Sequence, residues 1–258
     1  MRGFVFSALI GAAGLSAVGC EENESMLFIV GVLAAEETDC IYSPEGTATL
    51  RTGGVLDISL RSSYRAGLLV GSQLTQRGNR DQLRTETARL SLYGAEVHLE
   101  TAAGAPIAEY TTIGTGFVHP AGGTEPGFGA MVVDVIPAGA PVGPGLVLAR
   151  IRVFGETLGG QEVESNEYSF PIQICTGCLI SYPAEAADMT QGPGIYRCNI
   201  RGEEAPTTQE PVCHVGQDVS APCTLCAAYS AVCEDPCQNC SAVGTGLNCS
   251  GSPAPVCP

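Results

Sequence analysis

Apolar and polar side chains alternate in several short stretches between residues 26 and 174, with the period of two that is typical of half-buried β-strands. Residues 55–61 (VLDISLR) alternate throughout. Residues 88–100 (ARLSLYGAEVHLE) alternate as well, but their apolar phase shifts at Gly94, which predicts a bulge or bend there. The pattern predicts further strands over residues 26–35, 129–136, 146–158 and 167–174.

Glycine- and proline-rich turn signals separate these stretches, and no sustained helical periodicity competes with them. Seven to nine short strands over about 150 residues are typical of an all-β fold. We therefore expect residues 26–174 to form a two-layer antiparallel β-sandwich. An immunoglobulin-like arrangement is favoured, although the chain has no Trp and so lacks the Cys-Trp-Cys signature of true immunoglobulin domains. A jelly roll or small barrel is the alternative.

The composition changes after Ile174. Residues 175–258 hold eleven of the 13 cysteines, many prolines and few large apolar side chains. Burial alone cannot stabilise such a segment, whereas disulfide bridges worth on the order of 2–4 kcal/mol each could do so. The sequence predicts a cysteine-rich, disulfide-stabilised tail over residues 175–258.

The first 19 residues have the three parts of a secretory signal peptide. Arg2 supplies the positive start, residues 4–15 the apolar centre, and residues 16–19 (SAVG) the small-residue cleavage site. The apolar centre is too short for a permanent membrane span. Residues 20–25 would then be a polar tether ahead of the β-domain. Ordinary secretion after cleavage at Gly19 is one outcome of this pattern.

The sequence AVGC, ending at Cys20, resembles the lipobox of bacterial lipoproteins, with Ala17 where the family most often has Leu. The resemblance implies that Cys20 becomes the lipid-modified N-terminus and anchors the protein to a membrane. Glu21 follows instead of an inner-membrane retention Asp, which implies the outer membrane or cell surface. Residues 64–99 and 165–180 also resemble uncharacterised secreted lipoproteins of myxobacteria, a resemblance that implies no activity.

Thirteen cysteines cannot all form pairs. Assigning Cys20 to lipid leaves twelve, which can all be bridged in an oxidising compartment. Because eleven lie in the tail, Cys40 must then join one of them, and Cys175 or Cys178 is the expected partner. The predicted disulfide set is Cys40, Cys175, Cys178, Cys198, Cys213, Cys223, Cys226, Cys233, Cys237, Cys240, Cys249 and Cys257.

Three CxxC units leave two alternatives open. Cys223, Cys226, Cys237 and Cys240 have spacings that could hold Zn²⁺, and a CxxC pair could be redox-active if it began a helix. We expect bridges instead, with no metal and no cofactor. The histidines His98, His119 and His214 form no recognisable catalytic motif, and Glu164 and Glu167 are expected at a solvated strand edge.

The net charge of −15 argues against a nucleic-acid partner, because phosphate backbones would be repelled; all 12 basic residues are arginines. These observations favour an exported, non-catalytic binding or structural module of the cell envelope, with an envelope or extracellular protein or a glycan as partner. An envelope enzyme, for example one acting on polysaccharide, is the alternative from another class.

Overall fold

The structure, a computed structural model, describes residues 26–36, 39–77, 86–181 and 213–222, together with the backbone of residues 240–243 and 246–249. The predicted signal peptide, Cys20 and the tether lie outside these residues. So do the predicted bridges of Cys198, Cys223, Cys226, Cys233, Cys237 and Cys257, and the side chains of Cys240 and Cys249. The possible zinc set of Cys223, Cys226, Cys237 and Cys240 falls in the same regions.

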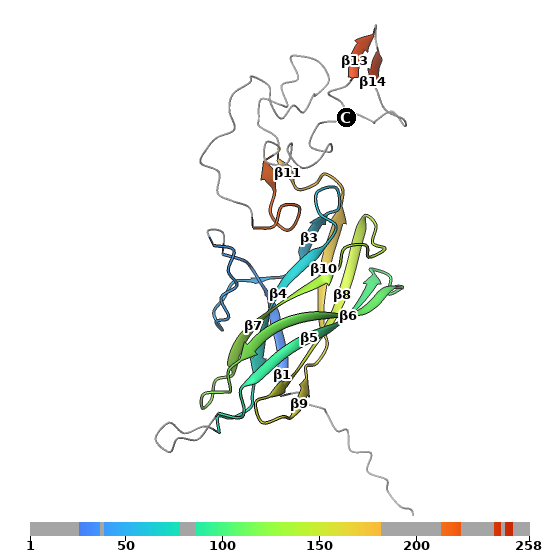
Figure 1. Cartoon of the computed structure of the whole chain (residues 1–258). Helices are drawn as coiled ribbons and strands as arrows, with labels where there is room; N and C mark the ends of the chain where they lie inside the picture. Colours follow the sequence, from blue (N-terminus) through green and yellow to red (C-terminus); the bar gives the residue numbers. More distant parts are fainter. Residues whose placement is uncertain are drawn as a thin grey trace, which may run out of the picture.

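Every regular element among the described residues is a β-strand (Figure 1). The described residues between 27 and 175 form ten strands, against the seven to nine expected; β2 has only two residues and β9 only three. The strands are β1 (Leu27–Leu33), β2 (Leu50–Arg51), β3 (Gly54–Asp57), β4 (Tyr64–Ser72), β5 (Leu90–Thr101), β6 (Pro106–Val118), β7 (Gly127–Ile136), β8 (Gly145–Thr157), β9 (Glu162–Glu164), β10 (Tyr168–Cys175), β11 (Ile180–Ser181), β12 (Ala221–Pro222), β13 (Cys240–Val243) and β14 (Gly246–Cys249).

Two sheets make up the body of the molecule. One has the order β2-β1-β4-β7, and the other has the order β3-β10-β8-β5-β6 with β9 paired to β8. Neighbouring strands in both are antiparallel except β3, which runs parallel to β10. The long strands curve, so that the sheets wrap round as a half-barrel (Figure 1). The described residues include no helix long and apolar enough to cross a bilayer.

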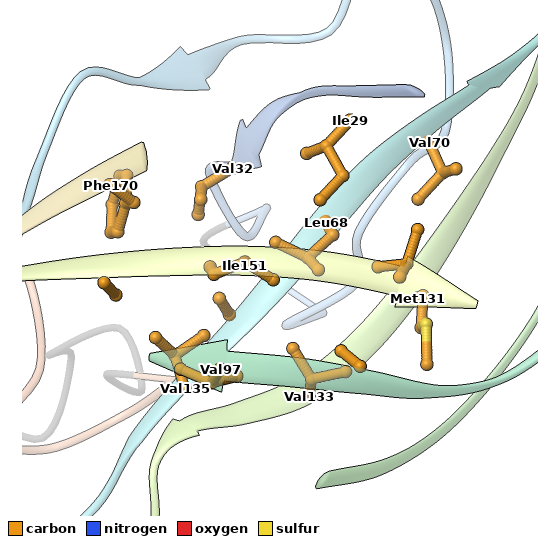
Figure 2. Close-up of a cluster of buried hydrophobic side chains, with 14 of the residues drawn as sticks. Ile29, Val32, Leu68, Val70, Val97, Met131, Val133, Val135, Ile151 and Phe170 are labelled. Carbon is orange, nitrogen blue, oxygen red and sulfur yellow. The ribbon is translucent and has the colours of Figure 1, made fainter. Parts of the chain in front are cut away.

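One hydrophobic core fills the space between the sheets. Figure 2 shows Leu68 of the first sheet beside Ile151 of the second, and Val32 of the first beside Phe170 of the second. The alternation read from the sequence explains which side chains enter it. On β8, the core-facing residues are at most 3% exposed, and each contributes roughly 1.5–3 kcal/mol if it is a full-sized aliphatic side chain. These residues are Val147, Ala149, Ile151 and Val153.

The bulge predicted at Gly94 is confirmed. The pairing of β5 with both neighbours shifts between Leu92 and Gly94: the extra residue lies on β5 in the pairing with β8, and on β6 in the pairing with β6. The ring of Phe154 lies directly over Gly94, because a Cβ there would be 2.3 Å from the Phe154 Cζ. A side chain at position 94 would displace that ring.

The strand predicted over residues 55–61 is shorter than expected. β3 ends at Asp57, where the chain turns. The buried Asp57 carboxylate accepts hydrogen bonds from the Ser59 backbone N–H at 3.1 Å and the Ser59 hydroxyl at 2.5 Å. The amides of Leu60 and Arg61 bond to the Asp57 carbonyl. Local hydrogen bonds from Asp and Ser therefore replace the strand ladder after Asp57.

Glycines bring β6 and β7 into contact and so join the two sheets at one side. A Cβ at Gly116 would lie 2.3 Å from the Ala130 carbonyl oxygen, and one at Gly129 would lie 2.0 Å from that of Phe117. Such backbone-to-backbone packing leaves no room for a side chain. The alternating glycines of this hairpin thus fix where the second sheet folds over the first.

Candidate functional site

Ten residues of the predicted cysteine-rich region pack against the β-domain. Residues 213–222, here called the docked segment, lie at the β3 end of the molecule (Figure 1). The Asp218 amide donates to the Val55 carbonyl at 2.9 Å, and the Gly216 carbonyl accepts from the Asp57 amide at 2.9 Å. β12, at the end of the docked segment, pairs in parallel with β11. The docked segment is thereby tied both to β3 of the domain and to the residues that follow β10.

A disulfide joins Cys40 to Cys213, at the start of the docked segment, with Cα atoms 5.3 Å apart. The prediction that Cys40 joins a tail cysteine is confirmed, but the expected partner, Cys175 or Cys178, is wrong. Those two are bridged to each other within one tight turn. The buried Asp57 carboxylate holds that turn by accepting hydrogen bonds from the amides of Gly177 at 2.8 Å and Leu179 at 3.0 Å.

A pocket of about 350 Å³ lies between the end of β1, the start of β4 and the docked segment. Its lining combines apolar side chains with polar ones, among them two arginines, one aspartate, one histidine and two tyrosines. The apolar lining includes Val32, Leu33, Ala34, Ala35, Ala66, Val219 and Pro222, and the polar lining includes Tyr42, Arg51, Tyr64, Arg65, His214, Gln217 and Asp218. Pockets that bind small molecules have this size and this mixture.

Asp218 is the most heavily bonded residue of the pocket wall. Its side chain is only 7% exposed and its φ is +63°, a backbone conformation that Asp and Asn adopt more readily than other non-glycine residues. The carboxylate accepts hydrogen bonds from the Val55 amide at 2.8 Å and the Tyr64 hydroxyl at 2.9 Å. Arg51 Nε lies 3.6 Å away and balances its charge.

Gln217 acts as an extra strand residue beside β4. Its side-chain carbonyl accepts from the Arg65 amide at 2.9 Å, and its side-chain amide donates to the Arg65 carbonyl at 2.6 Å. Gln217 is 4% exposed, so these bonds are shielded from water. The docked segment therefore supplies hydrogen-bond partners for both backbone polar groups of Arg65.

Tyr42 and His214 contact each other in the pocket lining. The Tyr42 hydroxyl lies 3.1 Å from His214 Nε2, and the Tyr42 ring covers Gly67, where a Cβ would be only 2.4 Å from the ring. Burial, and then the charges of Arg61 and Arg65, lower the pKa of His214 below its ordinary 6.5. The imidazole is thus neutral at pH 7 and makes an uncharged contact with Tyr42.

The pocket tyrosines are held in their protonated form. Burial, followed by the nearby Asp218 charge, raises the pKa of Tyr64 far above 10. The same two causes raise the pKa of Tyr42, against the opposing charges of Arg51, Arg65 and Arg61. Both hydroxyls are therefore hydrogen-bond donors throughout the physiological range and are unsuited to act as bases.

The outer face of the larger sheet holds a second group of polar side chains. His98 Nε2 lies 3.9 Å from a Glu96 oxygen and 3.7 Å from a Glu109 oxygen, and all three residues are at least 38% exposed. These ligand atoms could approach one cation. Arg152 Nη1 also lies 3.8 Å from Glu96, so ion pairing in solvent accounts for the arrangement. His98 is on the polar face of its strand, as expected.

The remaining polar residues of interest are separate from the pocket. Glu164 and Glu167 line a shallow recess near the start of β1, and each has an arginine partner, at 3.2 Å from Arg152 and 2.9 Å from Arg150 respectively. His119 is exposed in the connection between β6 and β7. None of these three residues lines the pocket that contains Asp218.

Sequence reasoning missed the residues that build the pocket, apart from Cys213 and His214. Arg51, Tyr64 and Asp218 belong to three separate segments and have no motif spacing. The one usable signal is the stretch HVGQD after Cys213, which places polar residues in a short run next to a predicted bridge. Searches of protein-family models, curated proteins and solved structures find no match to this chain.

Proposed function

We propose that this protein is an exported lipoprotein, anchored through Cys20 at the outer membrane or cell surface, whose β-domain is a non-catalytic binding module. The pocket beside the docked segment is its binding site. Two observations support export. The Cys40–Cys213 and Cys175–Cys178 bridges require an oxidising compartment, and the signal-like residues 1–19 end at a lipobox-like cysteine.

An immunoglobulin-like sandwich is the fold that the strand order favours. β1, β4 and β7 are neighbours in one sheet, while β6, β5, β8 and β10 follow one another in the other. That is the distribution of strands A, B, E and C′, C, F, G in immunoglobulin-like domains. The parallel pairing of β3 with the last long strand, β10, supports the same assignment.

The direction of β1 suits a tethered receptor. β1 starts at Leu27, seven residues after Cys20, and its far end contributes Val32 and Leu33 to the pocket. Seven residues of strand span about 20 Å, because each residue advances about 3.3 Å. The pocket therefore lies at the end of β1 remote from Leu27, and a chain anchored through Cys20 would present it away from the membrane.

The construction of the pocket by the docked segment is the observation that carries the proposal. A bridge, a parallel strand pair and the bonds of Gln217 and Asp218 all hold this segment in place. The result is a recess of about 350 Å³ instead of a filled core, with Ala34, Ala35 and Ala66 among the larger side chains of its lining. A segment with only a stabilising role would be expected to fill that space with larger side chains.

The binding role is tested by screening the full chain against a library of small soluble compounds, with line broadening of the compound signals in NMR as the readout. Ala35→Trp places a large side chain in the pocket lining, and Ala105→Trp is the matched change in the exposed β5–β6 turn. Compounds that bind the wild type should be lost with Ala35→Trp and kept with Ala105→Trp. Binding that is equal in both variants would overturn the assignment of the site.

The anchor is tested separately by labelling cells with a palmitate analogue. The wild-type chain should take up label and the Cys20→Ala variant should not. Equal labelling of the two chains would remove the lipoprotein assignment but would leave the pocket unaffected.

A further inference from the structure

We infer that the pocket takes a small monocarboxylate with an apolar body, and that Arg51 receives its carboxylate. The inference rests on the proposed binding function and adds the chemical class of the ligand. It rests on which hydrogen-bond donors and acceptors of the pocket wall already have partners, and on the apolar surface that surrounds them.

The carboxylate of the pocket wall is already occupied. Asp218 Oδ1 receives the Val55 amide, and Oδ2 receives the Tyr64 hydroxyl at 2.9 Å and the Gln217 side-chain amide at 3.3 Å. Arg51 adds its charge to the same carboxylate. A cationic ligand would have to break these bonds, because Asp218 is the carboxylate that the pocket lining contains.

The donors are not all occupied. Arg51 carries five N–H groups, and its contact with the described residues is the 3.6 Å ion pair from Nε to Asp218. No hydrogen bond engages its two terminal nitrogens within the part of the chain that the structure describes. The Arg51 side chain is 27% exposed and lines the pocket. A planar carboxylate matches such a guanidinium through two parallel hydrogen bonds.

The charges around the pocket favour an anion locally, in contrast to the chain as a whole. The chain has a net charge of −15, but three of its 12 basic residues, Arg51, Arg61 and Arg65, act together on the Tyr42 hydroxyl. The residues that line the pocket include two arginines, Arg51 and Arg65, and one carboxylate, Asp218, which leaves one positive charge in excess within the lining; Asp134, outside the lining, pairs with Arg65 at 2.9 Å. A monoanion fits this excess better than a dianion.

The rest of the lining predicts the other end of the ligand. Val32, Ala34, Ala66, Val219 and Pro222 are all apolar, and none is larger than valine or proline. These side chains offer no hydrogen bonds to a polyol or a peptide. An aliphatic or aromatic body would displace water from them, as it does in most small-molecule sites.

The test uses the full chain with octanoate, octanamide, acetate and inorganic phosphate as probes, titrated by NMR. Octanoate should bind at least tenfold more tightly than octanamide, which lacks the charge, and than acetate, which lacks the apolar body. It should also bind at least tenfold more tightly than phosphate. Raising the salt concentration from 20 to 500 mM should weaken octanoate binding and leave octanamide binding unchanged.

Variants locate the anion. Arg51→Gln should reduce octanoate affinity to that of octanamide, and Arg51→Lys, which keeps the charge but loses the fork of two donors, should retain part of the difference. Arg152→Gln removes an arginine from the outer face and should have no effect. Circular dichroism identifies any variant that fails to fold, and for such a variant the ligand series on the wild type decides.

The outcomes separate this inference from the proposed function. Equal binding of octanoate and octanamide, or octanoate binding that survives Arg51→Gln, would overturn the carboxylate assignment while the pocket remained a binding site. Binding of phosphate or acetate as tight as that of octanoate would overturn it too. If no probe binds, but compounds from the library of small soluble compounds bind the wild type and do not bind Ala35→Trp, only the ligand class would be overturned. Failure of both the probes and the library would overturn the binding function itself.

Discussion

The hydroxyl of Tyr64 lies 2.9 and 3.1 Å from the two carboxylate oxygens of Asp218, which is 154 residues further along the chain. Tyr64 begins β4 and is fully buried, whereas Asp218 belongs to the docked segment. The contact therefore links the core of the β-domain to the region that the sequence identifies as its tail. The stability of the domain and the shape of the pocket depend on the same bond.

Tyr64→Phe removes the hydroxyl and keeps the ring packed against Phe170. We expect the free energy of unfolding to fall by about 1–3 kcal/mol, because a buried carboxylate loses a hydrogen-bond donor. Urea denaturation measures the change. The control is Tyr93→Phe. Tyr93 is 44% exposed on the outer face, so the loss of its hydroxyl should lower the free energy of unfolding by less than about 0.5 kcal/mol. Equal effects would show that Asp218 does not depend on Tyr64.

Asp57→Asn tests the turn that contains the Cys175–Cys178 bridge. The buried carboxylate accepts hydrogen bonds from Ser59, Gly177 and Leu179. The side-chain NH₂ of asparagine would replace one accepting oxygen by a group that only donates, so it would face N–H groups that also donate. The free energy of unfolding should fall by about 2–4 kcal/mol. Asp134→Asn, in a half-exposed pair with Arg65, should cost about 0–1 kcal/mol. A small effect at position 57 would contradict the proposed role of its carboxylate.

Replacing both Cys40 and Cys213 by Ser removes the bridge without leaving a free thiol. A loss of about 2–5 kcal/mol of stability is expected, as for other native disulfides in secreted domains. Hydrogen exchange should become faster at the amides of the docked segment, including Asp218, and change least in β8 at the centre of its sheet. Unchanged exchange in the docked segment would mean that its other contacts are sufficient to hold it.

His214 should make stability depend on pH. Its pKa is lowered in the folded protein, so between pH 6.5 and that lower value the unfolded chain binds more protons than the folded one. Stability is then fully present above about pH 6.5 and decreases as the pH falls below it. The slope of the free energy of unfolding between pH 7.5 and 5 should decrease in His214→Gln. A slope identical to that of the wild type would contradict the burial of this imidazole.

Alternation made part of this fold predictable. β5 and β8 bury one face and expose the other, so their hydrophobic pattern, including the shift at Gly94, is directly visible in the sequence. β4 shows no such alternation, because both of its faces are covered. Tyr42 packs over Gly67 and Phe28 over Gly71, on the side away from the core. A strand covered on both faces cannot be recognised by a period of two.

β6 was hidden for a different reason. Its inward positions include Gly114 and Gly116, where the backbone of β7 takes the place of a side chain, while Ile113 and Phe117 are 86% and 52% exposed. Two large hydrophobic residues of this strand therefore point away from the core, whereas Val118 at its end is buried in it. Only the tertiary contact with β7 explains that inverted pattern.

The candidate site could not be predicted because its parts are brought together by the bridge. The odd number of cysteines predicts that Cys40 forms a disulfide with a tail cysteine. It does not predict which of the eleven lies nearest to Cys40 in space. Arg51, Tyr64 and Asp218 meet only after the docked segment has been placed. Each of them taken alone is an ordinary strand or loop residue.

The most direct test of this account is a non-reducing peptide map that identifies the partner of Cys40. Cleavage beside acidic residues places Cys40, between Asp39 and Glu45, and Cys213, between Glu204 and Asp218, on fragments with no other cysteine. The account predicts that mass spectrometry finds these two fragments joined and that reduction separates them. A fragment of Cys40 joined to Cys175, Cys178 or any other cysteine would contradict the placement of the docked segment, and with it the pocket.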